Sequence, residues 1–248
     1  MARAPRPPRE GDTFDHPWVL RATAGLLRGT LTCVTRKDWH GQENLPPVGQ
    51  GFIAVSNHIT YADPLTFAHF LYNAGRVPRF LAKSSLFGVP IIGPVLRACG
   101  QIPVYRGSAR AKDAVDEGAL ALTSGGTIAV FPEGTLTRDP ELWPMVARTG
   151  VARMALETGV PVVPVVQWGA QRLLGTYKKV PHLFPRKKVT VIAGPEIDLS
   201  EFRDRPLDAE LLRAATDHIM DTLTAMLQDV RGESAPAQRY DMRKKDQA

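Results

Sequence analysis

The sequence contains little cysteine: Cys33 and Cys99 are the two in 248 residues. Two cysteines cannot form a disulfide framework, and neither lies at a metal-ligand spacing from another cysteine. This scarcity is typical of a reduced, cytoplasmic setting. We therefore expect neither a disulfide-stapled fold nor a bound metal.

Long hydrophobic runs are also missing. Residues 1–12 are rich in proline and arginine and lack the apolar core of a secretory signal. An uncharged apolar stretch in the middle of the chain, residues 84–96, contains glycine and proline and is shorter than the roughly 18–20 residues of a membrane-spanning helix. The sequence thus predicts no conventional transmembrane helix.

Several nucleotide-binding and hydrolase signatures are absent. The chain has no G-x-G-x-x-G motif, no Walker loop and no G-x-S-x-G nucleophile elbow. With 31 Lys and Arg against 25 Asp and Glu, the net charge of +6 favours an anionic partner. Aromatic residues are only 7% and do not alternate with the basic residues, so a nucleic-acid-binding module is a remote alternative.

The apolar patterns that are present alternate between strand and helix types. They predict a single α/β domain with a mixed, largely parallel sheet flanked by helices. We expect a flexible arm at 1–14, an N-terminal amphipathic helical segment at 15–38, the α/β domain at 39–230 and a flexible tail at 231–248. The expected strands are 51–56, 79–82, 102–105, 127–131, 162–166 and 189–193, and the expected helices are 18–34, 65–72, 108–124, 149–158 and 207–230.

The first expected helix, 18–34, has apolar residues at three- and four-residue steps, with Arg21 and Arg28 at the edge of that face. An apolar face flanked by arginine can lie on an anionic membrane. It can equally pack on its own domain, because Gly25 and Gly29 suit close helix contact. Both alternatives stay open here.

His58 and Asp63 form the first candidate site. His58 follows the expected strand 51–56, at the end of a strand where open α/β sheets place their ligands. A carboxylate on one ring nitrogen fixes the tautomer and leaves the other nitrogen to accept a proton. On an ideal helix the two side chains would point about 140° apart, so the pair needs a turn. The alternatives are a buried structural histidine and an Asp63 that caps a helix before Pro64.

Two further segments bring polar groups to expected strand ends. Residues 100–106 end in Arg106, whose planar guanidinium suits a phosphate. Residues 131–138 place Glu133 in a tight turn formed by proline and glycine. Taken singly, each segment is more often an ordinary loop, with Glu133 paired to a surface cation.

Four motifs together carry a family resemblance. They are NHxxxxD at 57–63, GxxPxxR at 100–106, FPEGT at 131–135 and VPVVP at 160–164. In this order and spacing they resemble the glycerolipid acyltransferases, and most of all the 1-acylglycerol-3-phosphate acyltransferase type. The sequence departs from the family at Pro103, where an aromatic residue is usual, and at Leu136, where arginine is usual. These departures leave another lysophospholipid or a glycolipid hydroxyl open as the acceptor.

The resemblance implies acyl transfer from acyl-CoA or acyl carrier protein to a glycerol hydroxyl, with no bound cofactor. It implies that His58 is the general base and that Asp63 orients it. It also implies that the acceptor phosphate contacts Arg106 and that the acceptor site is shaped by Glu133, Gly134 and Thr135. Asn57 and Arg138, within and just after these motifs, are further candidate substrate contacts. No serine or cysteine nucleophile is evident, so we expect no acyl-enzyme intermediate.

The placement of charge supports an anionic substrate. Residues 64–112 and 158–195 contain no Asp or Glu, and the first window contains Lys83, a candidate second phosphate contact. The apolar stretch 84–96 could line an acyl tunnel, dip into a bilayer or pack in the core. We therefore expect a peripheral enzyme on the cytoplasmic face of an anionic membrane, with a lysophospholipid and acyl-CoA as partners and no nucleic acid.

Overall fold

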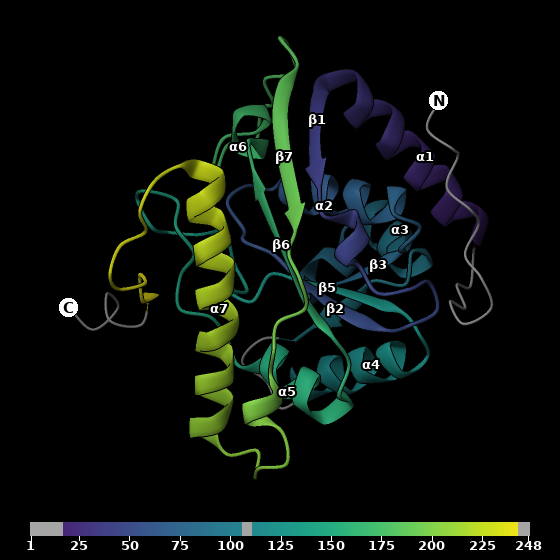
Figure 1. The fold of residues 1–248 in the computed structure, drawn as a ribbon. Coiled ribbons are helices and arrows are strands. Elements are labelled where there is room, and N and C mark those ends of the chain that lie inside the picture. Colours follow the sequence, from purple (N-terminus) through teal and green to yellow (C-terminus); the bar gives the residue numbers. More distant parts are fainter. Residues whose placement is uncertain (1–16, 106–110, 243–248) are drawn as a thin grey trace.

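The computed structural model describes residues 17–105 and 111–242. Its centre is a seven-stranded sheet with the order β1-β7-β6-β2-β5-β3-β4, and helices cover both faces (Figure 1). Neighbouring strands are parallel except β6 and β7, which are antiparallel. The predicted single α/β domain with a mixed, largely parallel sheet is confirmed.

All the expected strands and helices occur in the described residues. The strands are β1 (Thr35–His40), β2 (Phe52–Val55), β3 (Pro78–Lys83), β4 (Ile102–Val104), β5 (Thr127–Val130), β6 (Val162–Trp168) and β7 (Lys187–Ala193). The helices are α1 (Pro17–Val34), α2 (Asp63–Asn73), α3 (Ile92–Ala98), α4 (Ala111–Thr123), α5 (Gly150–Thr158), α6 (Ala170–Leu173) and α7 (Ala209–Arg231). Short 3-10 helices are η1 (Gln42–Asn44), η2 (Ser84–Gly88) and η3 (Ser200–Phe202). The expected helix 108–124 corresponds to α4, and its expected start at Ser108 lies outside the described residues.

The central strands β2 and β5 are buried along their whole length. Their short apolar sequences, FIAV and TIAV, suit parallel strands that are covered on both faces. The register pairs Val55 with Val130, so the two strands end level with each other. The segments that follow them, 56–63 and 131–138, therefore emerge as neighbours at one edge of the sheet.

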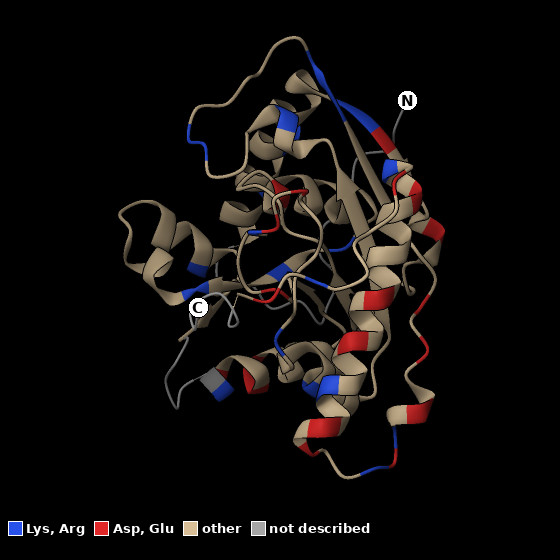
Figure 2. Cartoon of the chain, turned by 90° about the vertical axis from the view of Figure 1, so that its left-hand side faces the viewer, with Lys and Arg blue, Asp and Glu red and all other residues tan. Residues whose placement is uncertain are grey.

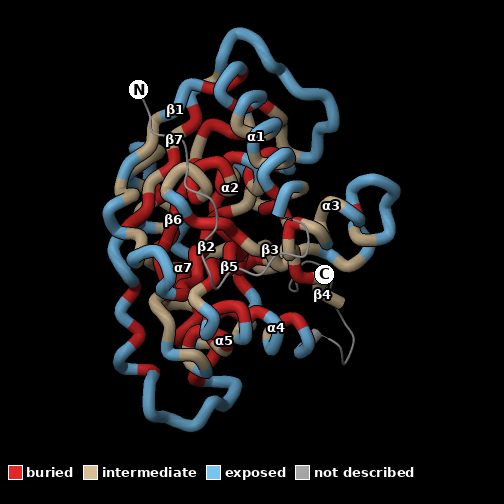
Figure 3. Tube along the Cα trace, turned by 90° about the vertical axis from the view of Figure 1, so that its right-hand side faces the viewer, coloured by how far each residue is buried: buried red, intermediate tan, exposed pale blue. Residues whose placement is uncertain are grey.

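The alternation of side chains along β2 divides the core into two layers. Ile53 and Val55 face a layer built with α4, α5 and α7. Phe52 and Ala54 face a second layer, to which α1 and α2 contribute. Figure 3 shows buried chain through the middle of the sheet and exposed chain around it. One face of α1 therefore packs on its own domain, which was one of the two alternatives.

The long helix α7 closes the first layer. At its start the Asp208 side chain accepts a hydrogen bond from the Leu211 N–H (2.8 Å), and at its end Gly232 adopts a left-handed conformation (φ 66°). An apolar stripe of α7 is buried, and the helix packs on β6. The stripe consists of Leu211, Leu212, Ala215, Ile219, Leu223 and Leu227.

The boundary after α1 differs from the prediction. The helix ends at Val34, and the next residues form β1, which pairs in parallel with β7. The prediction of a helical segment is therefore wrong for residues 35–38, and the sheet begins at Thr35. The sequence TRKDWH lacks a strong apolar alternation, so its strand depends on the β7 ladder and on the 2.9 Å ion pair between Asp38 and Lys188.

The segment after α7 folds back onto the domain. The Tyr240 carbonyl accepts a hydrogen bond from the Val146 N–H (3.0 Å), and the Arg231 guanidinium lies 3.8 Å from the centre of the Trp143 ring. The part of the predicted tail up to residue 242 thus contacts the domain. Residues 243–248 lie outside the described residues.

Truncation of Leu223 tests the packing of α7. Leu223 is fully buried, so Leu223→Ala should lower the free energy of unfolding by about 2–5 kcal/mol through lost contacts and a residual cavity. The control is Leu120→Ala on α4, where 69% exposure predicts a change below about 0.5 kcal/mol. Denaturant unfolding measures both values, and equal losses would contradict the described packing.

Candidate active site

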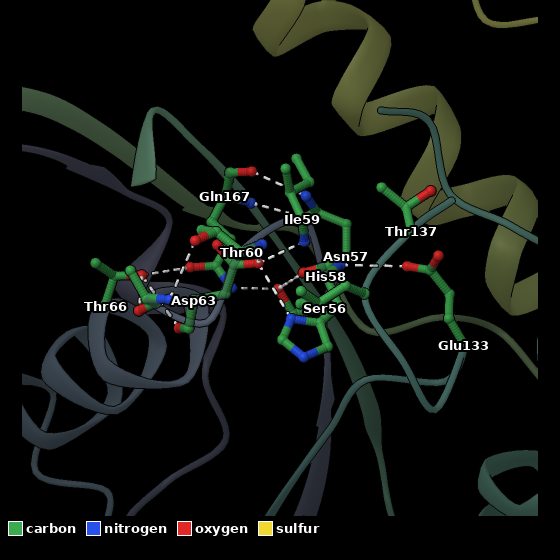
Figure 4. Close-up of polar contacts among 12 residues, drawn as sticks. Ser56, Asn57, His58, Ile59, Thr60, Asp63, Thr66, Glu133, Thr137 and Gln167 are labelled. Carbon is green, nitrogen blue, oxygen red and sulfur yellow. Dashed lines mark hydrogen bonds and ion pairs between the residues drawn. The ribbon is translucent and has the colours of Figure 1, made fainter. Parts of the chain in front are cut away.

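His58 and Asp63 meet in the turn between β2 and α2. The His58 Nδ1 lies 3.1 Å from the Asp63 Oδ2 (Figure 4). The same oxygen accepts hydrogen bonds from the backbone N–H groups of Ile59 (2.5 Å) and Thr60 (2.8 Å). The turn folds Asp63 back toward the histidine, as the five-residue spacing required. Asp63 does begin α2, but its carboxylate binds the preceding turn rather than capping the helix.

This arrangement assigns different roles to the two nitrogens of His58. An ionised carboxylate only accepts hydrogen bonds, so the nitrogen that faces Asp63 carries the proton. Figure 4 shows Nε2 on the side of the ring away from Asp63. The His58 side chain is 14% exposed and that of Asp63 only 2%. The accessible Nε2 is therefore the atom that can take a proton from a substrate.

Phe131 fixes the plane of the His58 ring. The two rings are stacked, with centroids 4.0 Å apart and planes inclined by 17°. Phe131 belongs to the FPEGT motif and also lines the cavity beside His58. It was not among the predicted site residues, and its place in that motif was the available signal.

Glu133 holds the two strand-end segments together. Its carboxylate accepts hydrogen bonds from the backbone N–H groups of His58 (3.2 Å) and Met145 (3.0 Å). It is buried and is not among the residues that line the cavity. Burial raises the pKa of Glu133 to about 8, against the lowering effect of the two hydrogen bonds. The geometry therefore favours a bracing role for Glu133 over a direct part in the acceptor site.

Asn57 has a similar bracing role. Its side-chain amide donates to the Gln167 carbonyl and accepts from the Gln167 N–H, both at 2.9 Å, so it ties the end of β2 to β6. It is 1% exposed and does not line the cavity, which argues against the predicted substrate contact. The Gln167 side chain in turn donates a hydrogen bond to the Ser56 hydroxyl and accepts one from the Thr66 hydroxyl. Gln167 was not among the predicted site residues, and the available signal for it was a polar residue in an apolar strand.

The remaining predicted substrate contacts differ in position. Lys83, Gly134 and Thr135 line the cavity. Gly134 has a left-handed conformation (φ +71°), which is the reason for glycine at this place in the turn. Arg138 is exposed and does not line the cavity. Arg106 lies outside the described residues.

A cavity of about 640 Å³ lies beside His58, between α1, α2, β3 and α3. Its walls are largely apolar: Leu20, Leu27, Ala68, Leu81, Val95 and Leu96 are among the lining residues. His69 also lines it, and burial, aided by the charges of Lys37 and Arg28, lowers the pKa of His69 to about 4. This imidazole is therefore neutral near pH 7 and adds no charge to the wall.

The apolar stretch 84–96 lies mostly at the surface, although Val95 packs against the small cluster of Leu20, Val77 and Cys99. Gly93 is its one buried residue. Leu86 lines the cavity, whereas Ile91 is 82% exposed. No helix among the described residues combines the length and the apolar character needed to cross a bilayer. The described residues also contain no group of three or more His, Cys, Asp or Glu placed to hold a metal ion.

The site thus consists of a histidine oriented by a buried carboxylate, at the carboxyl edge of a parallel sheet and beside an apolar cavity. Such a site can take a proton from a substrate whose apolar part is buried. The chain belongs to the Acyltransferase family, whose sequence profile matches residues 36–168.

Relatives with known names agree with this family. A chloroplastic 1-acyl-sn-glycerol-3-phosphate acyltransferase of Brassica napus is 32% identical over 142 residues, which are 57% of this chain and 40% of that protein. A 1-acyl-sn-glycerol-3-phosphate acyltransferase of Borreliella burgdorferi is 36% identical over 126 residues, which are 50% of this chain and 48% of that protein. The chain therefore spans less than half the length of these relatives.

A solved structure shares the fold. It is that of the 1-acyl-sn-glycerophosphate acyltransferase PlsC from Thermotoga maritima, with a TM-score of 0.67 and 24% sequence identity. The match covers 88% of this chain and 82% of that chain. The likeness therefore extends over most of the α/β domain.

The raised pKa of Glu133 predicts a specific dependence of stability on pH. The folded chain keeps this proton up to about pH 8, whereas the ordinary value for a glutamate is 4.5. The Glu133 contribution to stability is therefore full below pH 4.5 and is lost as the pH rises through 8. Glu133→Gln has no such proton to lose. The Tm of Glu133→Gln minus the Tm of the unaltered protein should therefore rise between pH 4.5 and about pH 8 in thermal unfolding experiments. A Tm difference that does not change with pH would contradict the raised pKa.

Proposed function

We propose that this protein transfers a fatty acyl group from acyl-CoA or acyl carrier protein to the free hydroxyl of a 1-acylglycerol-3-phosphate, which gives phosphatidic acid. The observation that carries the proposal is the His58–Asp63 pair beside an apolar cavity of about 640 Å³. The names of the relatives support this acceptor.

The geometry suits a direct transfer. The His58 Nε2 takes the hydroxyl proton as the hydroxyl oxygen attacks the thioester carbonyl. The tetrahedral intermediate then collapses, the carbon–sulfur bond breaks, and the leaving thiolate takes the proton from His58. Asp63 holds the imidazole in one tautomer and stabilises its charged form. No bound cofactor and no acyl-enzyme enter this sequence of steps.

The cavity provides space for the acyl chain, and the basic residues suit the phosphates. Lys83 ends β3 and lines the cavity, so its ammonium group can reach an acceptor or donor phosphate near His58. Gly134 and Thr135 line the same cavity. Arg106 remains the proposed contact for the acceptor phosphate on the strength of the motif alone.

We also propose that the protein binds the cytoplasmic face of an anionic membrane peripherally. The other face of α1 exposes Trp18 (70%) and Leu26 (74%). Arg21 and Arg28 lie on the same helix. An exposed apolar face with neighbouring arginines suits a bilayer surface with anionic headgroups.

An assay of thiol release tests the activity. Purified protein in detergent is given several acyl-CoAs and acyl carrier proteins together with a panel of lysophospholipids and glycolipids. We expect thiol release that depends on 1-acylglycerol-3-phosphate. His58→Ala should lower turnover at least about a hundredfold, because a general base contributes roughly 10²–10⁴-fold. Its circular dichroism spectrum should match that of the unaltered protein.

Three outcomes would count against the proposal or a part of it. Thiol release that is absent with every donor and acceptor would reject acyl transfer. Preference for another lysophospholipid or a glycolipid would keep the chemistry and replace the acceptor. A covalent acyl-protein on the reaction path would reject direct transfer.

Filling the cavity tests its role as the acyl site. Ala68 on α2 lines the cavity, so Ala68→Phe should reduce its length or volume and shift the preference toward shorter acyl-CoAs. The control is Leu120→Phe, on the exposed side of α4. Competition among acyl-CoAs of different length measures the shift. An unchanged chain-length profile in Ala68→Phe would place the acyl chain elsewhere.

A further inference from the structure

The segment between α6 and β7, residues 174–186, is an exposed loop with apolar side chains. All residues from 177 to 186 are exposed. Among them Val180 is 72% and Phe184 is 71% exposed, and Leu183 is 40% exposed. Water-facing aromatic and aliphatic side chains that cluster in one loop indicate a surface that is covered in the working protein.

The same loop is basic. It lies inside the acid-free window 158–195 and contains Lys178 and Lys179 close to Val180. Both lysines are exposed. No ion pair involves either lysine among residues 17–105 and 111–242. Their charges are therefore available to an anionic partner.

The base of the loop is fixed to the site. The Thr60 hydroxyl, in the turn between His58 and Asp63, donates to the Leu174 carbonyl (2.5 Å). The Tyr177 hydroxyl donates to the Thr137 carbonyl (3.0 Å) in the segment that carries FPEGT. A ligand on the loop would therefore be held at a defined position relative to the His58–Asp63 pair.

The far end of the loop is fixed to α1. The Arg186 guanidinium donates to the carbonyls of Thr32 (2.8 Å) and Thr35 (2.6 Å), at the C-terminal end of that helix. The loop is thereby joined to α1, whose exposed apolar face is a proposed membrane contact.

The loop lies beside the cavity, opposite a second exposed apolar segment. Tyr177 from the loop and Leu86 from η2 both line the cavity. Figures 2 and 3 both show the loop and the η2–α3 segment projecting from the same side of the molecule. The η2–α3 segment exposes Val89, Ile91 and Ile92 there. The two projections therefore flank one side of the cavity.

We propose that the 174–186 loop is a membrane-docking element that inserts Val180, Leu183 and Phe184 into an anionic bilayer while Lys178 and Lys179 bind its headgroups. This inference rests on the proposed function, because it places the cavity and the His58–Asp63 pair beside the membrane that contains the lysophospholipid acceptor. An acidic carrier protein would pair with the charges of the lysines, but it would not account for the exposed apolar side chains of Phe184 and Val180. A bilayer accounts for both the charge and the apolar side chains.

Vesicle binding by the full chain tests this proposal. The vesicles contain equal parts of phosphatidylglycerol and phosphatidylcholine, and binding is measured by co-sedimentation. The double variant Val180→Ser/Phe184→Ser should bind at least about tenfold more weakly, because it removes two apolar anchors. The matched control is Val48→Ser/Leu120→Ser, which removes two exposed apolar residues elsewhere (55% and 69%). Lys178→Gln/Lys179→Gln should weaken binding to these vesicles but not to pure phosphatidylcholine.

Activity in detergent separates this proposal from the proposed function. Thiol release by the unaltered protein in detergent tests the chemistry without a bilayer, so its absence would reject the function whatever the vesicles show. The loop variant should keep that activity and lose vesicle binding. Binding as tight as that of the control variant would overturn the membrane-docking proposal. A selective loss of transfer from acyl carrier protein, with vesicle binding intact, would overturn it too and would assign the loop to the carrier protein.

Discussion

The site depends on the hydrogen bonds that the Asp63 carboxylate accepts. One of its oxygens accepts hydrogen bonds from the His58 ring and from the backbone N–H groups of Ile59 and Thr60. The same contacts close the turn between β2 and α2 and choose the histidine tautomer. Without that carboxylate, the turn would lose its internal acceptor and Nε2 would lose its defined role as a base. The Asp63 carboxylate therefore determines both the local fold of the turn and the histidine tautomer that the proposed chemistry needs.

Around this centre, buried polar groups act as braces. Glu133 joins the His58 backbone to Met145, and Asn57 joins the end of β2 to Gln167 on β6. Each brace links segments that are far apart in the sequence. The cavity beside His58 is largely apolar, so polar contacts hold His58 in place and the apolar walls are left for the proposed substrate. Two of the predicted substrate contacts, Glu133 and Asn57, therefore make bracing hydrogen bonds and do not line the cavity.

The sequence predicts the fold well where the pattern is strong and local. The buried strands β2 and β5 and the amphipathic α7 follow from short apolar runs and from periodicity. The sequence does not predict β1, because that strand depends on pairing with β7, more than a hundred residues away in the chain. The His58–Asp63 pair was predictable from its spacing and motif. The stacking of Phe131, the network of Gln167 and the burial of Glu133 depend on tertiary contacts that spacing does not encode.

We infer that Asp63 holds His58 with its hydrogen on Nδ1 and so leaves Nε2 as the proposed base. Two-bond ¹⁵N–¹H NMR spectra of histidine-labelled protein near neutral pH measure this directly, with His58→Gln to assign the signals. In the neutral form of the His58 ring, the hydrogen should lie on Nδ1, and Nε2 should carry none. The opposite tautomer, with the hydrogen on Nε2, would contradict it.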